Sequence, residues 1–530
     1  MALLILVLLV AVCSYFTLRP LFSPLYKVPA AHWSSRFSPL WILWTRWSGN
    51  ELSRLIDAHH KHGPIVLVGP QDLSVSCYQD GIQKVYDAGF PKPAPFYSMF
   101  NYYRQRNAFT SLERNEHGLR RRRTACLYSK SALIQSEHLR EVTVCLIYDR
   151  LLPRLNAAAT GNCNGRIDGL DLSYRVCTDY LSSFLFGYSN GTDYLSSMPV
   201  LGKDLDFDGL SLWRFHYENL SCHEAFFVQE TPGLYAFLKL VGINLLPKKY
   251  TDATAFLEGW MSQMVEKAER MIGWKQRTGL TLAPKDEPAV YETAMEAVRS
   301  DSPHLSEKEQ RMQVATEMFD HISASREVLG LILGYAFWYL AQHPDAQHRI
   351  SAELDAHGID MSSRSPDSNT QDTGTPSRAT QLDSLPYLHA VIDECLRMRP
   401  TSTPLPRITP ADREVFVAGF SIPPGTRINS FQWFVHRDPR KWENVNCWDP
   451  QRWLQIDRVS GKKCNREDVL WPFASGPRMC LGNHLAYYCM QHILAVVCSR
   501  FVLTALPREE RQCWPGSPED ELPIRVVLRG

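Results

Sequence analysis

The sequence predicts a mainly α-helical fold with small β-sheets. Apolar residues recur with helical periodicity from about residue 130 to 345, whereas strand-like patterns are confined to stretches at 62–77 and 414–430. Of the 530 residues, 45% are hydrophobic and 21% are charged, which is enough apolar material for a large core. No shift in composition divides the chain after residue 50, so we expect one large domain over residues 51–530.

The N-terminal segment predicts a membrane anchor over residues 1–19. Its first 18 residues, MALLILVLLVAVCSYFTL, are apolar and carry no charge before Arg19, and this is about the minimum length for a spanning helix. Arg19, Lys27 and Arg36 follow, so the positive-inside rule places the bulk of the chain in the cytosol. The alternative is a cleaved signal peptide, which normally opens with basic residues. Residues 20–50 are expected to form a proline-bearing linker.

Local patterns place the first elements of the domain. The stretch HGPIVLVGPQDLSVSC at 62–77 alternates apolar and polar residues around Gly-Pro, which predicts a hairpin. A long helix is predicted over 306–343, because Ser306 and Glu309 have capping-box spacing and Pro344 ends the pattern.

The later elements follow from similar signals. Residues 361–380 are rich in Ser, Thr, Pro and Gly and are expected to be a flexible insertion. LPYLHAVIDECLRMRP predicts a helix that ends before Pro400, and EVFVAGFSIPPGTRINS predicts a strand, a Pro-Pro-Gly turn and a second strand.

Charge and cysteine content exclude some classes of protein. Lys plus Arg (57) and Asp plus Glu (56) almost cancel, so we expect no nucleic-acid partner. The 14 cysteines show neither CxxC pairs nor regular spacing, which indicates reduced thiols instead of a secreted disulfide framework.

One cysteine, Cys480, lies in a stretch with a chemical interpretation, FASGPRMCLG. A thiolate serves as an axial haem ligand only where it is sheltered from oxidation and its charge is offset. Gly476 and Gly482 allow the backbone to pack tightly beneath a flat cofactor, with amides directed at the sulfur. Arg478 can pair with a haem carboxylate, and Phe473 can cover the sulfur side. The apolar run after Gly482 predicts a helix whose positive end helps to hold the thiolate.

This stretch is similar to the signature of the cytochrome P450 superfamily of haem-thiolate monooxygenases, of the fungal microsomal type. The resemblance implies the cytochrome P450 fold with an N-terminal transmembrane helix, a catalytic domain over 51–530 and haem b (iron-protoporphyrin IX) bound through Cys480. A buried structural cysteine in a glycine-bearing loop is the alternative, and the fixed spacing of five residues argues against it. The resemblance extends from about residue 60 to 490.

Further positions match the residues with which the family binds the haem propionates. In EHGLRRRRTACLYS, Arg121 lies seven residues before Tyr128, where the family has such an arginine, and His117 stands where many relatives carry Trp. Arg407 in PLPRIT matches another such position. The neighbouring arginines, expected either to receive an acidic electron-donor protein or to form a solvated basic face, are Arg120, Arg122 and Arg123.

A structural triad is also implied by the resemblance. Glu394 and Arg397 are three residues apart on a predicted helix and therefore face one another. In the family this pair binds an Arg from a Pro-x-Arg segment, and WDPQRW supplies Arg452, with Gln451 where Glu is more common. Such a triad needs all its members, because an unpaired buried charge costs several kcal/mol.

The middle of the long helix, DHISASREVLG, departs from the family at its most important point. The family usually reads Ala-Gly-x-Glu/Asp-Thr, and the dipeptide Asp320-His321 fixes the alignment. Ser325 then stands for Gly, Glu327 retains the acid, and Val328 replaces the threonine whose hydroxyl normally helps to deliver protons.

Three outcomes of this departure stay open. Either Ser325 or a bound water replaces the threonine, or a hydroxyl of the substrate completes the relay, or the reaction has different proton needs. We expect Glu327 and Ser325 to be the catalytic side chains, although Glu327 could instead form an ion pair with Arg326 or another neighbour.

The resemblance implies a monooxygenase on the endoplasmic-reticulum membrane, with a cytosolic catalytic domain. Electrons would come from NADPH-cytochrome P450 reductase, with cytochrome b5 as a further possible donor. The substrate would be a small, largely apolar organic molecule, and KHGPIV, YSKS and the Asp-His dipeptide favour fungal secondary metabolism. One alternative is a haem-thiolate enzyme that catalyses coupling, desaturation or rearrangement without oxygen insertion, and another is a non-catalytic haem-binding protein.

Overall fold

The computed structural model describes most of the chain, namely residues 22–161, 165–198, 209–221, 223–361, 364, 377–401, 404–454, 469–507 and 521–529. The predicted membrane anchor over 1–19 and most of the predicted insertion over 361–380 lie outside these residues. Within the described part, no helix combines the length and the apolar character that crossing a bilayer requires.

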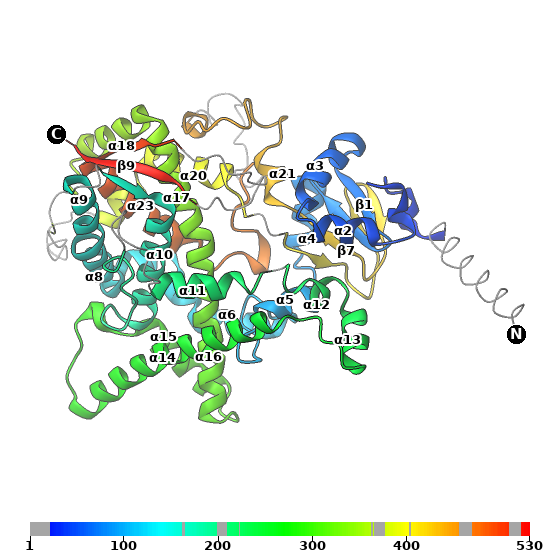
Figure 1. Cartoon of the computed structure of the whole chain (residues 1–530), viewed down its shortest axis with the longest axis horizontal. Helices are drawn as coiled ribbons and strands as arrows, with labels where there is room; N and C mark the ends of the chain where they lie inside the picture. Colours follow the sequence, from blue (N-terminus) through cyan, green and yellow to red (C-terminus); the bar gives the residue numbers. More distant parts are fainter. Residues whose placement is uncertain are drawn as a thin grey trace, which may run out of the picture.

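Helices dominate the described chain, as predicted, and most of them gather in one half of the molecule (Figure 1). The helices of eight or more residues are α2 (Leu40–Trp47), α3 (Glu51–His62), α6 (Arg114–Ala125), α8 (Glu137–Cys145), α9 (Leu152–Thr160), α10 (Gly169–Phe186), α11 (Gly209–Glu218), α13 (Pro232–Leu240), α14 (Lys248–Thr278), α15 (Ala289–Asp301), α16 (Glu307–Ala324), α17 (Leu331–Gln342), α18 (Pro344–Ala356), α20 (Pro386–Met398) and α23 (Asn483–Arg500). Shorter helices are α4 (Gln83–Tyr86), α5 (Ala94–Tyr97), α7 (Lys130–Gln135), α12 (Phe226–Glu230), α19 (Arg378–Asp383) and α21 (Gln432–His436).

Small sheets complete the described fold. A four-stranded sheet has the order β1-β2-β7-β4, a three-stranded sheet the order β3-β9-β8, and a hairpin joins β5 and β6. The four-stranded sheet lies beside α2 and α3, in the half of the molecule opposite the main helical bundle (Figure 1). The strands are β1 (Ile65–Gly69), β2 (Asp72–Val75), β3 (Arg166–Asp168), β4 (Arg407–Ile408), β5 (Val415–Val417), β6 (Phe420–Ile422), β7 (Arg427–Asn429), β8 (Phe501–Ala505) and β9 (Pro523–Leu528).

The two predicted strand regions have different outcomes. The hairpin at 62–77 is confirmed, since β1 and β2 pair antiparallel. Over 414–430 the predicted Pro-Pro-Gly turn and the strand after it, β7, are confirmed, but the single strand predicted before the turn is wrong, because a hairpin of β5 and β6 stands there. The turn between β5 and β6 is made by Ala418 and Gly419, whose φ angles are +49° and +84°. Alanine seldom adopts a positive φ, so the sequence carries little sign of this turn.

Residues 22–50, the described part of the predicted linker, are packed against the domain. Leu25 and Val28 are buried. The Ala31 amide donates to the Leu67 carbonyl at 2.9 Å, and the Leu67 amide donates to the Pro29 carbonyl at 2.7 Å. These bonds add the stretch to the outer edge of β1, so that it follows the sheet instead of extending as a free spacer.

The long helix predicted over 306–343 is present as α16, the π-helical turn η9 (Ser325–Gly330) and α17. The Ser306 hydroxyl accepts a hydrogen bond from the Glu309 amide, and the Glu309 carboxylate accepts one from the Ser306 amide, so the predicted capping box is confirmed. In Figure 1 this helix runs as one rod through the helical half of the molecule. Its middle is the π-helical turn, a feature frequent at functional sites.

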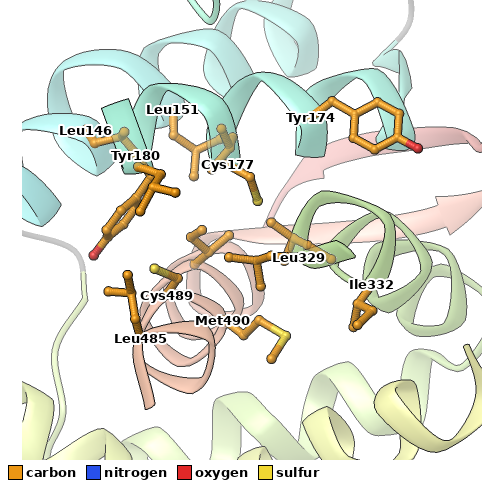
Figure 2. Close-up of a cluster of buried hydrophobic side chains, with 14 of the residues drawn as sticks. Leu146, Leu151, Tyr174, Cys177, Tyr180, Leu329, Ile332, Leu485, Cys489 and Met490 are labelled. Carbon is orange, nitrogen blue, oxygen red and sulfur yellow. The ribbon is translucent and has the colours of Figure 1, made fainter. Parts of the chain in front are cut away.

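The turn η9 packs closely on α10. Figure 2 shows side chains from α10, η9, α17 and α23 meeting in one buried cluster, with Cys177 from α10, Leu329 from η9 and Cys489 from α23. Gly330 permits this approach, because a Cβ atom there would lie 2.7 Å from the Cδ1 atom of Tyr174.

We predict that Gly330→Ala lowers the free energy of unfolding by about 1–3 kcal/mol, because the added methyl overpacks the contact between η9 and α10. Gly259→Ala on α14 is the matched control, since a Cβ at Gly259 would have no neighbour within 4 Å. That variant should be neutral or more stable by up to about 1 kcal/mol, because alanine favours the helix. Urea denaturation measures both, and equal effects of the two substitutions would contradict the packing explanation.

Candidate functional site

Cys480 lies in a tight loop immediately before α23. Its backbone amide donates to the Phe473 carbonyl at 2.8 Å, and the Met479 amide donates to the Gly476 carbonyl at 3.1 Å. Gly476 has a φ of +71°, and a Cβ atom there would lie 2.5 Å from the backbone oxygen of Tyr86 at the end of α4. Glycine is therefore required at 476 by its contact with α4.

The Cys480 thiol faces the interior of the protein. Its surface is accessible, yet burial raises the pKa of the thiol, so the accessible space adjoins it inside the molecule. A backbone hydrogen bond from Gly482 and the charge of Arg121 both lower this pKa. A thiolate ligand requires burial that protects it from oxidation, together with an amide and a cation that offset its negative charge. The surroundings of Cys480 provide all three.

A group of buried and half-buried basic side chains surrounds His117. Burial first, and then the positive charges of the neighbouring groups, lower the pKa of His117 to about 4. These groups, called the cationic cluster below, are Lys92, Arg121, Arg407 and Arg478. Burial, together with the charges of Arg407 and Arg478, also holds the pKa of Lys92 well below its ordinary value. Four basic side chains from separate segments thus face one region.

Among the described residues, no member of the cationic cluster forms an ion pair. Arg121 donates to the Met479 carbonyl at 2.6 Å, Arg478 donates to the Leu112 carbonyl at 2.6 Å and also to the Ser111 carbonyl, and Arg407 donates to the Tyr97 hydroxyl at 2.5 Å. Buried charges normally have partners of opposite sign. The cluster therefore fits a ligand with two carboxylates, such as haem, beside Cys480.

Lys92 is the member of the cluster that the sequence analysis did not identify. Its ammonium donates to the Phe109 carbonyl and lies 4.4 Å and 4.5 Å from the ring centres of Tyr97 and Phe109. The Ile408 amide donates to the Pro91 carbonyl at 2.8 Å, which joins this segment to the strand of Arg407. The only local signal is a lysine between two prolines in an aromatic-rich stretch, and a single loop lysine usually lies in solvent.

The structure brings Glu394, Arg397 and Arg452 together. The Glu394 carboxylate accepts from Arg397 at 2.7 and 2.8 Å and from Arg452 at 3.1 Å. It also accepts from the Asp449 amide at 2.9 Å and from the Trp453 indole at 3.0 Å. Glu394 and Arg397 are fully buried, so this dense bonding offsets the cost of removing both charges from water.

Arg397 also connects this network to the cysteine loop. It donates to the His436 carbonyl at 3.1 Å, and the His436 Nε2 atom accepts from the Trp471 amide at 2.9 Å. The Trp471 indole then donates to the Ser475 hydroxyl at 3.1 Å inside the loop. Burial holds the pKa of His436 well below its ordinary value, which keeps Nε2 free of a proton to accept this bond.

Ser325 and Glu327, the predicted catalytic side chains, both have partners away from Cys480. The Ser325 hydroxyl donates to the Cys177 carbonyl on α10 at 3.3 Å. The Glu327 carboxylate pairs with Arg326, and the Arg326 guanidinium lies 4.3 Å and 5.4 Å from the ring centres of Tyr174 and Trp213. The ion pair left open for Glu327 by the sequence is therefore present. Their catalytic roles stay predictions.

Neither role expected for the arginines beside Arg121 holds for Arg120 or Arg123. Both are buried. Arg123 donates two hydrogen bonds of 2.8 Å to Asp301, and Arg120 lies 3.6 Å from Glu317. They join α6 to α15 and α16 instead of receiving a partner, since Asp301 lies on α15 and Glu317 on α16. Arg122 alone of the three is exposed.

We predict that Glu394→Gln lowers the free energy of unfolding by about 3–5 kcal/mol, because Arg397 and Arg452 would lose the anion that balances them. Arg440→Gln is the control, since it breaks an exposed pair with Asp438 and should cost less than about 1 kcal/mol. Urea denaturation of both variants measures the difference. If the two substitutions lower the free energy of unfolding by amounts within about 1 kcal/mol of each other, the Glu394 network adds little stability.

Comparisons with known proteins agree with this geometry. The family model described as Cytochrome P450 matches residues 36–517 of the chain. The chain is 24% identical to the cytochrome P450 monooxygenase hepC of Aspergillus oryzae, over 94% of this chain and 91% of the relative. It is 23% identical to efuB of Hormonema carpetanum, with coverage of 94% and 89%, and 27% identical to sdnE of Sordaria araneosa, with coverage of 84% and 80%. Both of these relatives are also named cytochrome P450 monooxygenases.

Proposed function

The chain belongs to the cytochrome P450 family and is a haem-dependent cytochrome P450 monooxygenase, and from this premise we propose that it oxidises a small, largely apolar organic molecule with dioxygen. The cofactor would be haem b and the substrate an intermediate of fungal secondary metabolism, which the fungal origin of the similar proteins favours. The observation that carries the proposal is the sheltered Cys480 thiol beside a cationic cluster without anions.

In this proposal Cys480 would hold the haem iron through its thiolate. The bound haem supplies the activation of dioxygen, which protein side chains cannot perform. The Gly482 amide and the positive charge of Arg121 stabilise the thiolate form, and the N-terminal end of α23 adds to this effect. The cationic cluster would neutralise the two haem carboxylates, and each guanidinium has donors left beyond its protein bonds.

Proton supply is the step at which this chain differs from its family. Val328 has no hydroxyl, and the Ser325 hydroxyl is already used on the Cys177 carbonyl. Glu327 is the remaining acid in η9, but Arg326 binds it and stabilises its ionised form. We therefore assign the delivery of protons to Glu327, which would act through water or through a hydroxyl of the substrate.

The specific observation of Val328 also favours a second candidate, a haem-thiolate enzyme that couples, desaturates or rearranges its substrate without oxygen insertion. Metabolites of the host with and without the gene separate the two. Accumulation of a compound one oxygen lighter than the lost product supports oxygen insertion. A difference only in hydrogens or in the carbon skeleton supports the second candidate.

We also propose that the protein acts on the endoplasmic-reticulum membrane and receives electrons from NADPH-cytochrome P450 reductase, with cytochrome b5 as an auxiliary donor. A series of exposed apolar side chains supports attachment to a membrane. One group lies before and on α2 and consists of Phe22, Trp33, Leu40 and Trp44. The other lies at α13 and consists of Phe237, Leu240 and Val241. Trp47 of α2 connects the two groups, because its ring centre lies 5.0 Å from that of Phe226 on α12, the helix directly before α13. No side chain of α13 is buried, although the helix is largely apolar.

The central prediction concerns Cys480. Cys480→Ser should abolish the red-shifted absorption band of the reduced carbon monoxide complex, because that band requires a thiolate opposite the gas. NADPH-dependent oxidation with the reductase should fall at least about a thousandfold. Cys489→Ser, which alters another thiol in the same region, is the control and should retain the band. A normal band in Cys480→Ser would exclude Cys480 as the thiolate ligand, and a normal band without any NADPH-dependent turnover in the native protein would favour a binding protein.

A second prediction addresses the missing hydroxyl. Val328→Thr should raise the fraction of NADPH electrons recovered in product instead of hydrogen peroxide, by about two- to tenfold, because it adds a proton-relaying group beside Glu327. Val328→Ala removes two methyl groups and opens space without adding a hydroxyl, and it serves as the control. Product and peroxide are quantified together with the substrate that the metabolite comparison identifies. An equal rise in both variants would point to access of water instead of the hydroxyl.

A further inference from the structure

A cavity of about 330 Å³ lies between α2, α3 and the chain just before α2. None of the residues that line it belongs to the site around Cys480. Figure 1 shows α2 and α3 side by side next to the four-stranded sheet, in the half of the molecule opposite the main helical bundle. Cavities of this size bind small molecules, so this one can take a polar headgroup.

The face of α2 that borders the cavity is aromatic. It carries Trp41, Trp44, Thr45 and Ser48, which follow one another at helical spacing. The Thr45 hydroxyl donates to the Ile42 carbonyl at 2.9 Å, and the Ser48 hydroxyl donates to the Thr45 carbonyl at 3.3 Å, so both hydroxyl protons are used within the helix. The two indole rings are therefore the main groups that α2 offers to a ligand, and the face of an indole attracts cations.

The face of α3 that borders the cavity is charged. Arg54, Asp57 and Lys61 are spaced three and four residues apart, on one side of the helix, and all three line the cavity. Their side chains are exposed, and within the described part of the chain none of them forms an ion pair or a side-chain hydrogen bond. The cavity therefore offers a ligand two cations and one carboxylate, together with two indole rings.

Exposed apolar side chains beside the cavity indicate that its occupant is a lipid. Trp33, Leu40 and Trp44 are 78%, 70% and 68% exposed, and Trp44 belongs both to this apolar surface and to the lining of the cavity. The ring of His32, another lining residue, lies 5.4 Å from that of Trp33 and 5.7 Å from that of Trp41, centre to centre. Tryptophan is enriched at the level of the lipid headgroups in membranes. A bilayer that covers these apolar side chains would bring its headgroups to the cavity.

We infer that this cavity binds the headgroup of a choline phospholipid. Arg54 and Lys61 bind its phosphate, as guanidinium and ammonium groups commonly do. Asp57 balances the charge of the trimethylammonium group, and the rings of Trp41 and Trp44 contact that group by cation–π interactions. A purely anionic headgroup would meet the Asp57 carboxylate and gain nothing from the rings. This inference rests on the membrane attachment proposed above and names the lipid that the protein binds there.

Short-chain lipids test the headgroup separately from the bilayer. Dihexanoylphosphatidylcholine and dihexanoylphosphatidylglycerol have the same chains and the same phosphate, and only the first carries a cation. Calorimetric titration of the full-length holoenzyme in a non-ionic detergent gives the affinity for each lipid. The choline lipid should bind about tenfold more tightly than the glycerol lipid, because the indole rings and Asp57 act on its ammonium group. Inorganic phosphate at the same concentration should not displace it.

Two sets of variants assign the contacts. Arg54→Gln combined with Lys61→Gln should weaken the binding of both lipids at least about tenfold, because both lipids carry the phosphate. Trp44→Leu should weaken the binding of the choline lipid alone and reduce the preference to about twofold or less. Lys267→Gln on α14 is the control, since it removes an exposed cation outside the cavity and should change neither affinity.

The altered side chains are exposed, so we expect every variant to fold, and the carbon monoxide band verifies this for each. Three outcomes would overturn the inference. The first is equal affinity of the native protein for the two lipids, the second is unchanged binding by the double variant, and the third is displacement of the choline lipid by inorganic phosphate, which would indicate a general anion site.

Co-sedimentation of the full-length protein with phosphatidylcholine vesicles separates this inference from the proposed membrane attachment. If the native protein does not sediment with the vesicles, the membrane attachment fails, while the titrations still decide whether the cavity binds the headgroup. If it sediments but binds the two short-chain lipids equally, the headgroup site is refuted and the membrane attachment is retained.

Discussion

The arrangement of the site depends on one carboxylate, that of Glu394. It binds Arg397, Arg452, the Asp449 amide and the Trp453 indole, so a single buried anion holds α20 to the segment that precedes the cysteine loop. Through His436 and Trp471 the same network reaches the loop itself. The position of Cys480 is thus set from more than 80 residues away by groups that never contact the reactive centre. Their role is to make that geometry rigid before any ligand arrives.

Charge balance distinguishes supporting residues from ligand-binding residues in this chain. The Glu394 network is closed, since its cations and its anion satisfy one another. The cationic cluster is open, since none of its members forms an ion pair among the described residues. The haem carboxylates would complete it.

Much of this organisation could be predicted from local sequence, and the rest could not for identifiable reasons. The capping box of the long helix and the hairpin at 62–77 depend on neighbouring residues, and the structure contains both. Lys92, Arg120 and Arg123 were missed or misassigned because their surroundings come from segments distant in sequence. The turn between β5 and β6 could not be predicted, because only the tertiary structure imposes a positive φ on Ala418.

The uncompensated cationic cluster has a consequence for the life of the protein in the cell. The basic groups around His117 repel one another until anionic groups neutralise them, so binding of the cofactor adds to the stability of the folded chain. Chains made while haem is scarce would populate open states and pass to the proteases that remove unfolded proteins. The abundance of this enzyme would then follow haem supply as well as gene expression, which links its pathway to the iron status of the host.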